Sequence, residues 1–225
     1  MQDREKFKHE GPYVLLTEGV NDCHLIASLC NYFKVPNDIF GLYRCDSDDK
    51  VLRRLSALLG GSIEMKTIGV VLDADAPGLV EKWAALTYRL EAEGYSVPSK
   101  PSKSGTIMNL VQRPTVGIWL MPDNDVDGML EDFCLRLAPP AAIEYAQKCV
   151  ADAKENGFSS FGDTHFSKAA IHTFLSWQDE PGMPMGQAVT RKALDPTYPL
   201  ATQFHSFLRS LFFPAMEVIA IPDGV

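Results

Sequence analysis

The sequence lacks any long apolar run. No stretch approaches the roughly 18 uninterrupted apolar residues that a membrane-spanning helix needs. The first six residues, Met-Gln-Asp-Arg-Glu-Lys, carry charges where a signal peptide has its apolar region. We therefore expect a cytoplasmic protein that makes no contact with a membrane.

Cysteine is scarce, and its spacing indicates no paired use. The five cysteines are odd in number, never form a Cys-x-x-Cys motif and lie mainly within apolar segments. This pattern favours neither a zinc site nor a disulfide framework. We predict reduced cysteines that pack in the core.

Basic residues are also too few for a protein that coats nucleic acid through positive charge. Lysine and arginine number 21 against 29 aspartates and glutamates, for a net charge of −8. Such a balance argues against binding through bulk positive potential. It leaves open a site in which divalent cations neutralise phosphate.

Two apolar segments each end in a pair of carboxylates. Residues 13–17 run into Glu18, Gly19 and Asp22, and residues 67–72 run into Asp73 and Asp75. Both segments are typical of buried strands closed by turn residues. If the two strands pair, their four carboxylates meet at one edge of the sheet.

The first half of the chain alternates between strand and helix patterns. Strands are predicted at 13–17, 38–44, 67–73 and 115–121, and helices at 20–33, 48–59 and 79–93. This alternation predicts an α/β fold with a mainly parallel central sheet flanked by helices, whose sites lie at the carboxyl ends of the strands. Residues 95–114 are expected to form a loop, with strand character near Val97 or Ile107.

Helices dominate the rest of the chain. We expect them at 129–137, 140–155, 165–177 and 200–212, followed by a last strand at 217–221. We therefore divide the chain into a core at 1–138 and a mainly helical C-terminal extension at 139–225, packed together as one compact domain. No internal repeat is evident.

A cluster of four carboxylates favours a hard cation. Like charges in close contact raise one another's pKa, and a bound cation or protonation relieves the repulsion. Carboxylate oxygens together with water and substrate phosphates are the usual ligands of Mg²⁺. The two strand ends therefore predict one or two Mg²⁺ or Mn²⁺ ions.

The spacing of these acids resembles a known domain. Glu18-Gly-x-x-Asp22 after one strand, followed by Asp73-x-Asp75 and Gly78 after another, is similar to the TOPRIM domain of topoisomerases, bacterial primases and OLD-family nucleases. The later stretches 116–132 and 168–178 look like a stand-alone branch of that superfamily. The resemblance implies a TOPRIM-like, Rossmann-like fold.

The resemblance also implies a reaction and a set of site residues. It implies a metal-dependent nuclease acting on DNA or RNA, with Glu18 as general acid or base and with Asp22, Asp73 and Asp75 in the metal site. OLD-like nucleases add a further acidic site, for which this chain offers Asp123, Glu131 and Asp132 after the strand at 115–121. On a predicted helix, Lys168 could face the metal and stabilise transition-state charge. Substrate contacts are expected from the basic loop residues Lys100, Lys103 and Arg113.

Other functions remain open at this stage. The chain could be a TOPRIM-like binding or regulatory module that needs a partner such as an ATPase, and it could form a homo-oligomer. A phosphatase or a glycosyltransferase could use Asp73-x-Asp75 alone, although neither explains Glu18 and Asp22. A calcium loop at 123–134 is disfavoured because its twelfth position is Cys134 in place of glutamate.

Overall fold

One mixed sheet forms the centre of the protein. The computed structural model describes residues 7–61 and 64–213. The strand order is β2-β1-β3-β5-β4, with β4 antiparallel to β5 and the other strands parallel. The bounds are β1 Tyr13–Thr17, β2 Gly41–Arg44, β3 Thr67–Asp73, β4 Thr106–Met108 and β5 Thr115–Met121. The prediction of an α/β fold with a mainly parallel sheet is confirmed.

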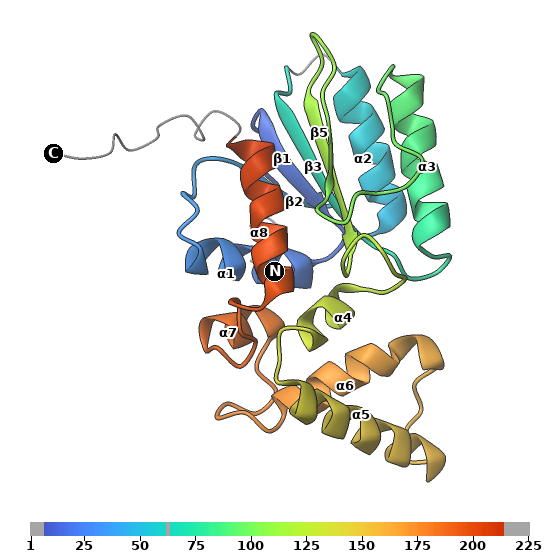
Figure 1. The fold of residues 1–225 in the computed structure, drawn as a ribbon, viewed down its shortest axis with the longest axis vertical. Coiled ribbons are helices and arrows are strands. Elements are labelled where there is room, and N and C mark those ends of the chain that lie inside the picture. Colours follow the sequence, from blue (N-terminus) through green and yellow to red (C-terminus); the bar gives the residue numbers. More distant parts are fainter. Residues whose placement is uncertain (1–6, 62–63, 214–225) are drawn as a thin grey trace, which may run out of the picture.

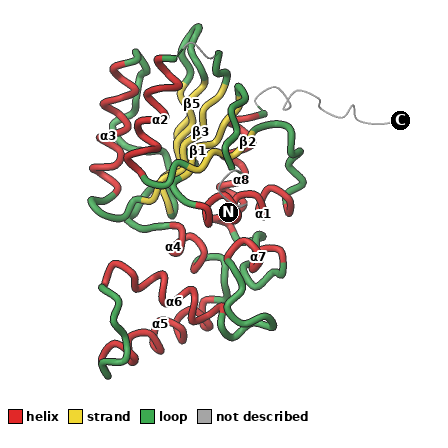
Figure 2. The backbone as a smooth tube through the Cα atoms, turned by 180° about the vertical axis from the view of Figure 1, so that it is seen from behind, coloured by secondary structure: helices red, strands yellow, loops and turns green. Residues whose placement is uncertain are grey.

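Helices cover both faces of this sheet. Figures 1 and 2 show α2 and α3 on one face and α1 and α8 on the other. Their bounds are α1 Val20–Tyr32, α2 Asp48–Gly60, α3 Leu79–Ala92 and α8 Pro199–Phe212. The sequence explains the ends of α2 and α3: the Ser47 hydroxyl accepts a hydrogen bond from Lys50 N at 3.3 Å, and Gly94 adopts a positive φ of 90° just past α3.

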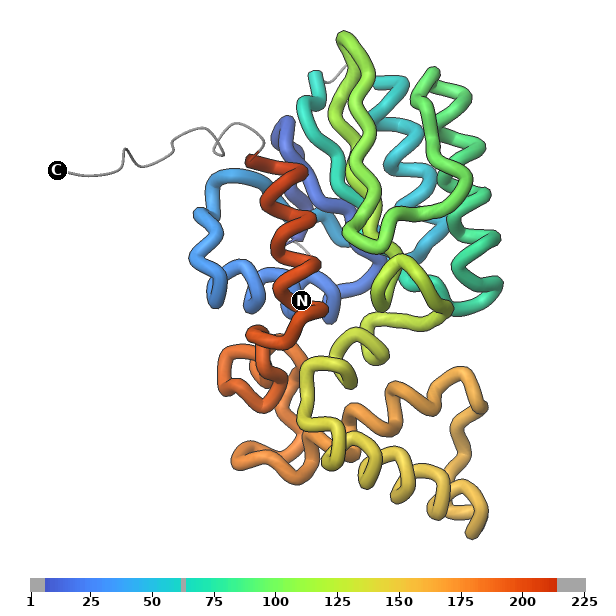
Figure 3. Tube along the Cα trace, viewed as in Figure 1, coloured from blue at the N-terminus to red at the C-terminus, as the bar shows by residue number. Residues whose placement is uncertain are grey.

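A second group of helices lies beyond the carboxyl ends of the parallel strands. It contains α4 Leu130–Leu135, α5 Pro140–Glu155, α6 Phe166–Leu175 and α7 Met185–Thr190. Figure 3 shows the chain leaving the sheet after β5, passing through these helices and returning to the sheet face as α8. We call α4–α7 the helical lobe. The lobe therefore faces the edge of the sheet where the predicted carboxylates lie.

Most element positions agree with the sequence predictions to within a few residues. Two differ in kind: α7 was not predicted, and the helix expected from His165 starts as a 3₁₀ turn, Asp163–His165, before α6. The helix α7 is six residues long and follows Pro184, so it offers little periodicity to detect. The predicted strand at 217–221 lies outside the described residues.

Two glycines let α8 pack closely on the sheet. Gly69 of β3 and Gly117 of β5 are opposite each other in register. An added Cβ at Gly117 would lie 2.5 Å from Leu211 Cδ2 of α8, and one at Gly69 would lie 3.1 Å from the same atom and 2.4 Å from Leu15 Cδ1 of β1. A side chain at either position would therefore force neighbouring leucine side chains to move.

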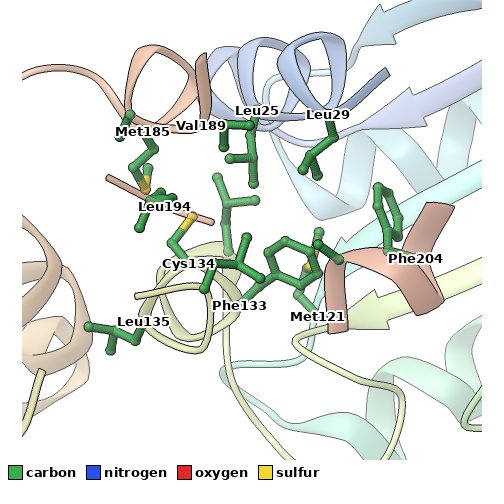
Figure 4. Packing of buried hydrophobic residues seen from close by; sticks show 14 of the residues in the cluster. Leu25, Leu29, Met121, Phe133, Cys134, Leu135, Met185, Val189, Leu194 and Phe204 are labelled. Carbon is green, nitrogen blue, oxygen red and sulfur yellow. The ribbon is translucent and has the colours of Figure 1, made fainter. Parts of the chain in front are cut away.

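A single hydrophobic cluster joins this face of the sheet to the helical lobe. It includes Leu15, Trp119 and Met121 of the sheet, Phe204 of α8, and lobe residues such as Phe133, Ile171 and Val189. Figure 4 shows Phe133 of α4 lying between Met121 and side chains from α1 and α7. The lobe is thus held against the sheet by shared apolar burial.

We predict that Phe204→Ala destabilises the protein by about 3 to 5 kcal/mol. Phe204 is 1% exposed and makes an edge contact with Trp119 at a ring-centroid distance of 5.1 Å. The matched control is Phe158→Ala, because Phe158 is 84% exposed. Urea denaturation measures both changes. Equal stability losses in the two variants would contradict this view of the core.

Within the described residues, no helix combines the length and the apolar character needed to cross a membrane.

Candidate acidic site at the sheet edge

The two carboxylate-bearing strand ends are neighbours. β1 pairs with β3 in parallel register, with Leu16 opposite Val70. At the carboxyl edge, Glu18 Oε1 accepts a hydrogen bond from the backbone N–H of Asp73 at 2.9 Å. The sequence prediction that these strand ends meet is therefore confirmed by the pairing and by this bond.

Asp22 reaches the same place from the start of α1. Its Oδ2 accepts a hydrogen bond from the N–H of Gly19 at 3.1 Å, which closes the first turn of the helix. The residue is only 5% exposed, and its Oδ1 is buried without a hydrogen-bond partner. A buried carboxylate oxygen without a partner costs free energy, so this atom is suited to a ligand.

The helical lobe adds a fourth carboxylate and a cation. The backbone N–H of Leu130, at the start of α4, donates to Asp73 Oδ1 at 2.9 Å. The next residue, Glu131, is 6% exposed, and its Oε1 lies 3.7 Å from Lys168 Nζ of α6. The start of α4 thus closes the site from the side opposite β1.

These groups line one pocket of about 530 Å³ between the sheet edge and the lobe. Its carboxylates are Glu18, Asp22, Asp46, Asp73, Asp75 and Glu131. Its basic side chains are Arg44, His165 and Lys168. We call the carboxylates the acidic cluster. The pocket therefore has an acidic floor on the sheet and basic side chains around it.

Burial and mutual repulsion both raise the pKa values in this cluster. Burial raises the pKa of Asp73 to about 9, with a further rise from nearby carboxylates that include Asp22 and Glu18. Burial likewise raises the pKa of Asp22 to about 7, and repulsion from Glu18 adds to it. The pKa of Glu18 is raised by burial despite the opposing hydrogen bond from Asp73. Without a cation, the site therefore favours protonated carboxyl groups near neutral pH.

The carboxylates do not yet form a coordination shell. Within residues 7–61 and 64–213, no group of three or more histidine, cysteine, aspartate or glutamate side chains is placed to hold a metal ion. Glu18 and Asp73 each use one oxygen to accept a backbone hydrogen bond, which leaves the other oxygen of each. Coordination of a metal here therefore requires at least one carboxylate to change rotamer.

Two of the acids expected in a further metal site have structural partners instead. Asp123 Oδ2 pairs with Arg136 Nη1 at 2.5 Å, and its Oδ1 accepts hydrogen bonds from two backbone amides of its own loop. Asp132 accepts bonds from the Met129 N–H at 2.8 Å and the Ser167 hydroxyl at 2.5 Å. Neither residue lines the pocket, whereas Glu131 does.

The basic loop residues expected to bind substrate also lie away from the pocket. Arg113 precedes β5 at the opposite, amino-terminal edge of the sheet and donates to Leu59 O at 3.0 Å. Lys103 pairs with Asp125 at 2.7 Å, and Lys100 is exposed beside α3. None of the three lines the pocket.

Several residues of the site were not singled out from the sequence. Arg44 ends β2, the strand paired with the other side of β1, and forms an ion pair at 2.7 Å with Asp46 just after it. Parallel strands present their carboxyl ends at one edge of a sheet, and β2 is one of these strands. The residues at its end could therefore have been predicted to lie at the site. Lys82 of α3, which is 5% exposed, lies beneath the acidic cluster and was also missed.

The fold and the site define an α/β protein with an acidic pocket at the carboxyl edge of its parallel strands. The chain belongs to the family described as "Protein of unknown function (DUF3226)", whose model matches residues 12–213. No curated protein and no solved structure matches the chain.

Proposed function

We propose that this protein is a Mg²⁺- or Mn²⁺-dependent phosphodiester enzyme, a nuclease acting on DNA or RNA, built on a TOPRIM-like version of the α/β fold. The observation that carries the proposal is the hydrogen bond from Asp73 N–H to Glu18 across paired strands, with Asp22 in the same pocket. It places the Glu18-Gly-x-x-Asp22 and Asp73-x-Asp75 stretches side by side. This proximity is what the resemblance requires.

The available donor atoms suit a hard cation. Six carboxylates line the pocket together with one histidine, His165, and no cysteine is among its lining residues. The partnerless Oδ1 of Asp22 and the raised pKa of Asp73 both indicate charge that a cation would compensate. In our proposal Asp22, Asp73 and Asp75 hold the cation, with Glu131 available for a second. The bound cation would polarise the phosphate and lower the pKa of a water molecule.

The chain's own side chains supply the remaining functions. Glu18 is half-buried, and burial raises its pKa above the ordinary value, which suits it to exchange a proton with a nucleophile or leaving group. Lys168, half exposed at the pocket wall, can stabilise negative charge on the phosphate from the side opposite the sheet. In this arrangement a phosphate binds between the acidic floor and the lobe.

The test is cleavage of single-stranded DNA, duplex DNA and RNA by the purified protein in Mn²⁺, Mg²⁺ and EDTA. We expect cleavage in Mn²⁺ and none in EDTA. Asp49→Asn serves as a control for charge removal, because Asp49 is 70% exposed on α2 and pairs only with Arg53 among the described ion pairs. Absence of metal-dependent cleavage on all three substrates would reject an autonomous nuclease.

The shortage of positive charge favours a second candidate function. With a net charge of −8 and only Arg44, Lys168 and His165 as basic residues around the pocket, the chain offers little to hold a long nucleic acid. A binding or regulatory module that works with a partner such as an ATPase fits that shortage. This candidate predicts Mn²⁺ binding to the isolated protein with no cleavage.

A further inference from the structure

Lys82 is a buried cation beneath the acidic cluster. It lies in the first turn of α3, and its side chain is 6% exposed. Lysine is almost never buried unless it is paired. A positive charge is also unfavourable near a helix N-terminus, where the helix dipole is positive. The surrounding carboxylates must therefore compensate for both costs.

Its partners come from separate elements of the sheet edge. Lys82 Nζ lies 2.6 Å from Asp48 Oδ2 at the start of α2 and 3.9 Å from Asp75 Oδ1 after β3. Attraction to Lys82 also lowers the pKa of Glu18, against the larger effect of burial. The Lys82 charge therefore acts on Asp75 and Glu18 from α3, whereas Lys168 reaches the pocket from α6.

We propose that Lys82 is a positioning residue that acts as the internal cation of the acidic cluster: it holds Asp75 in place and limits the affinity of the cluster for divalent metal. This inference rests on the proposed metal site. A fixed positive charge beside the carboxylates repels an incoming divalent cation and competes with it for Asp75. Lys82 also lets the carboxylates stay together when no metal is bound.

The alternative is a purely structural ion pair that fastens α2 to α3. The two roles predict different directions for metal affinity. If the pair is structural, breaking it from either side loosens the site and weakens metal binding, or leaves it unchanged. If Lys82 acts through its charge, removing that charge tightens metal binding.

The experiment measures Mn²⁺ binding by isothermal titration calorimetry. Lys82→Met keeps most of the apolar length of the side chain without its charge, and we expect its Kd for Mn²⁺ to fall about tenfold relative to wild type. Lys82→Arg retains the charge, and its Kd should stay within about threefold of wild type. An unchanged or weaker affinity in Lys82→Met would overturn the inference.

Lys82→Gln keeps the test decisive if Lys82→Met does not fold. Glutamine carries no charge but can still donate a hydrogen bond to Asp48, so a purely structural role predicts unchanged or weaker Mn²⁺ binding. If Lys82 acts through its charge, we expect binding at least about threefold tighter than wild type. Asp49→Asn, on the exposed neighbour of Asp48, is the control for an unrelated substitution and should bind as wild type does. Unchanged or weaker binding in Lys82→Gln would overturn the inference.

Wild-type binding separates this inference from the proposed function. If wild type binds Mn²⁺ and neither Lys82→Met nor Lys82→Gln binds it more tightly, only the role of Lys82 fails. If wild type binds no Mn²⁺, the metal site itself fails and the role of Lys82 fails with it.

Discussion

Replacing Glu18 with glutamine should reduce metal-dependent cleavage by about 10²- to 10⁴-fold, the usual contribution of a general acid or base. Glutamine has the same shape, and its carbonyl oxygen can still accept the hydrogen bond from the Asp73 N–H. The fold should therefore persist while proton transfer is lost. Initial rates on the best nucleic acid substrate measure the effect.

The control for this variant is Glu155→Gln, an exposed glutamate at the end of α5. It should cleave at the wild-type rate. If Glu18→Gln also kept the wild-type rate, Glu18 would have no part in the chemistry. A phosphatase or glycosyltransferase that depends on Asp73-x-Asp75 alone would then become the better hypothesis, to be tested on small phosphates and nucleotide sugars.

The second large effect concerns stability without metal. Asp22 has a folded-state pKa of about 7 against an ordinary value of 3.8, raised chiefly by burial. A carboxyl group with a raised pKa in the folded state binds more protons there than in the unfolded chain. Its destabilising contribution is therefore absent below pH 3.8 and grows as the pH rises toward 7. It is complete above that pH.

We accordingly expect Asp22→Asn to stabilise the metal-free protein by about 4 kcal/mol at pH 8. At pH 5 the gain should be less than half as large, because most of the difference in proton binding lies above that pH. Urea denaturation in EDTA at the two pH values measures this change. A loss of stability at pH 8 would contradict the assignment of Asp22 as a strained buried carboxylate.

Metal should stabilise the wild-type protein more than it stabilises Asp22→Asn. A cation that binds only the folded state stabilises it, and the wild-type cluster offers it one more carboxylate than Asp22→Asn does. In Mn²⁺ we expect the wild-type melting temperature to rise more than that of the variant. Equal shifts would mean that Asp22 is no part of a metal site.

Much of the fold could be predicted because the apolar patterns of single strands and helices agreed with the topology rules for parallel sheets. The acids after residues 17 and 72 ended clear apolar strands, and the alternation with helices implied parallel pairing, so the meeting of Glu18 and Asp73 followed. The antiparallel edge strand β4 is three residues long and carries almost no pattern. The sequence predicted strand character near Ile107, but it did not predict the antiparallel pairing of β4 with β5.

The parts of the site contributed by the lobe were harder to predict. Glu131 and Asp132 are adjacent in sequence, yet Glu131 faces the pocket while Asp132 closes the first turn of α4 and binds Ser167. Which of them faces the pocket depends on where α4 begins and how it packs. No local pattern contains that information. Lys82 was missed for a related reason, since its burial depends on α2 and α3 lying side by side.

The most direct test is a crystal structure of the protein soaked in Mn²⁺, with anomalous density used to locate the ion. We expect a peak at the carboxyl edge of β1 and β3, within about 2 to 2.5 Å of carboxylate oxygens from Asp22 and Asp73. At least one carboxylate at this edge should adopt a rotamer that differs from its rotamer in the present structure. A fully occupied Mn²⁺ elsewhere, with no density at this edge, would contradict the proposed metal site.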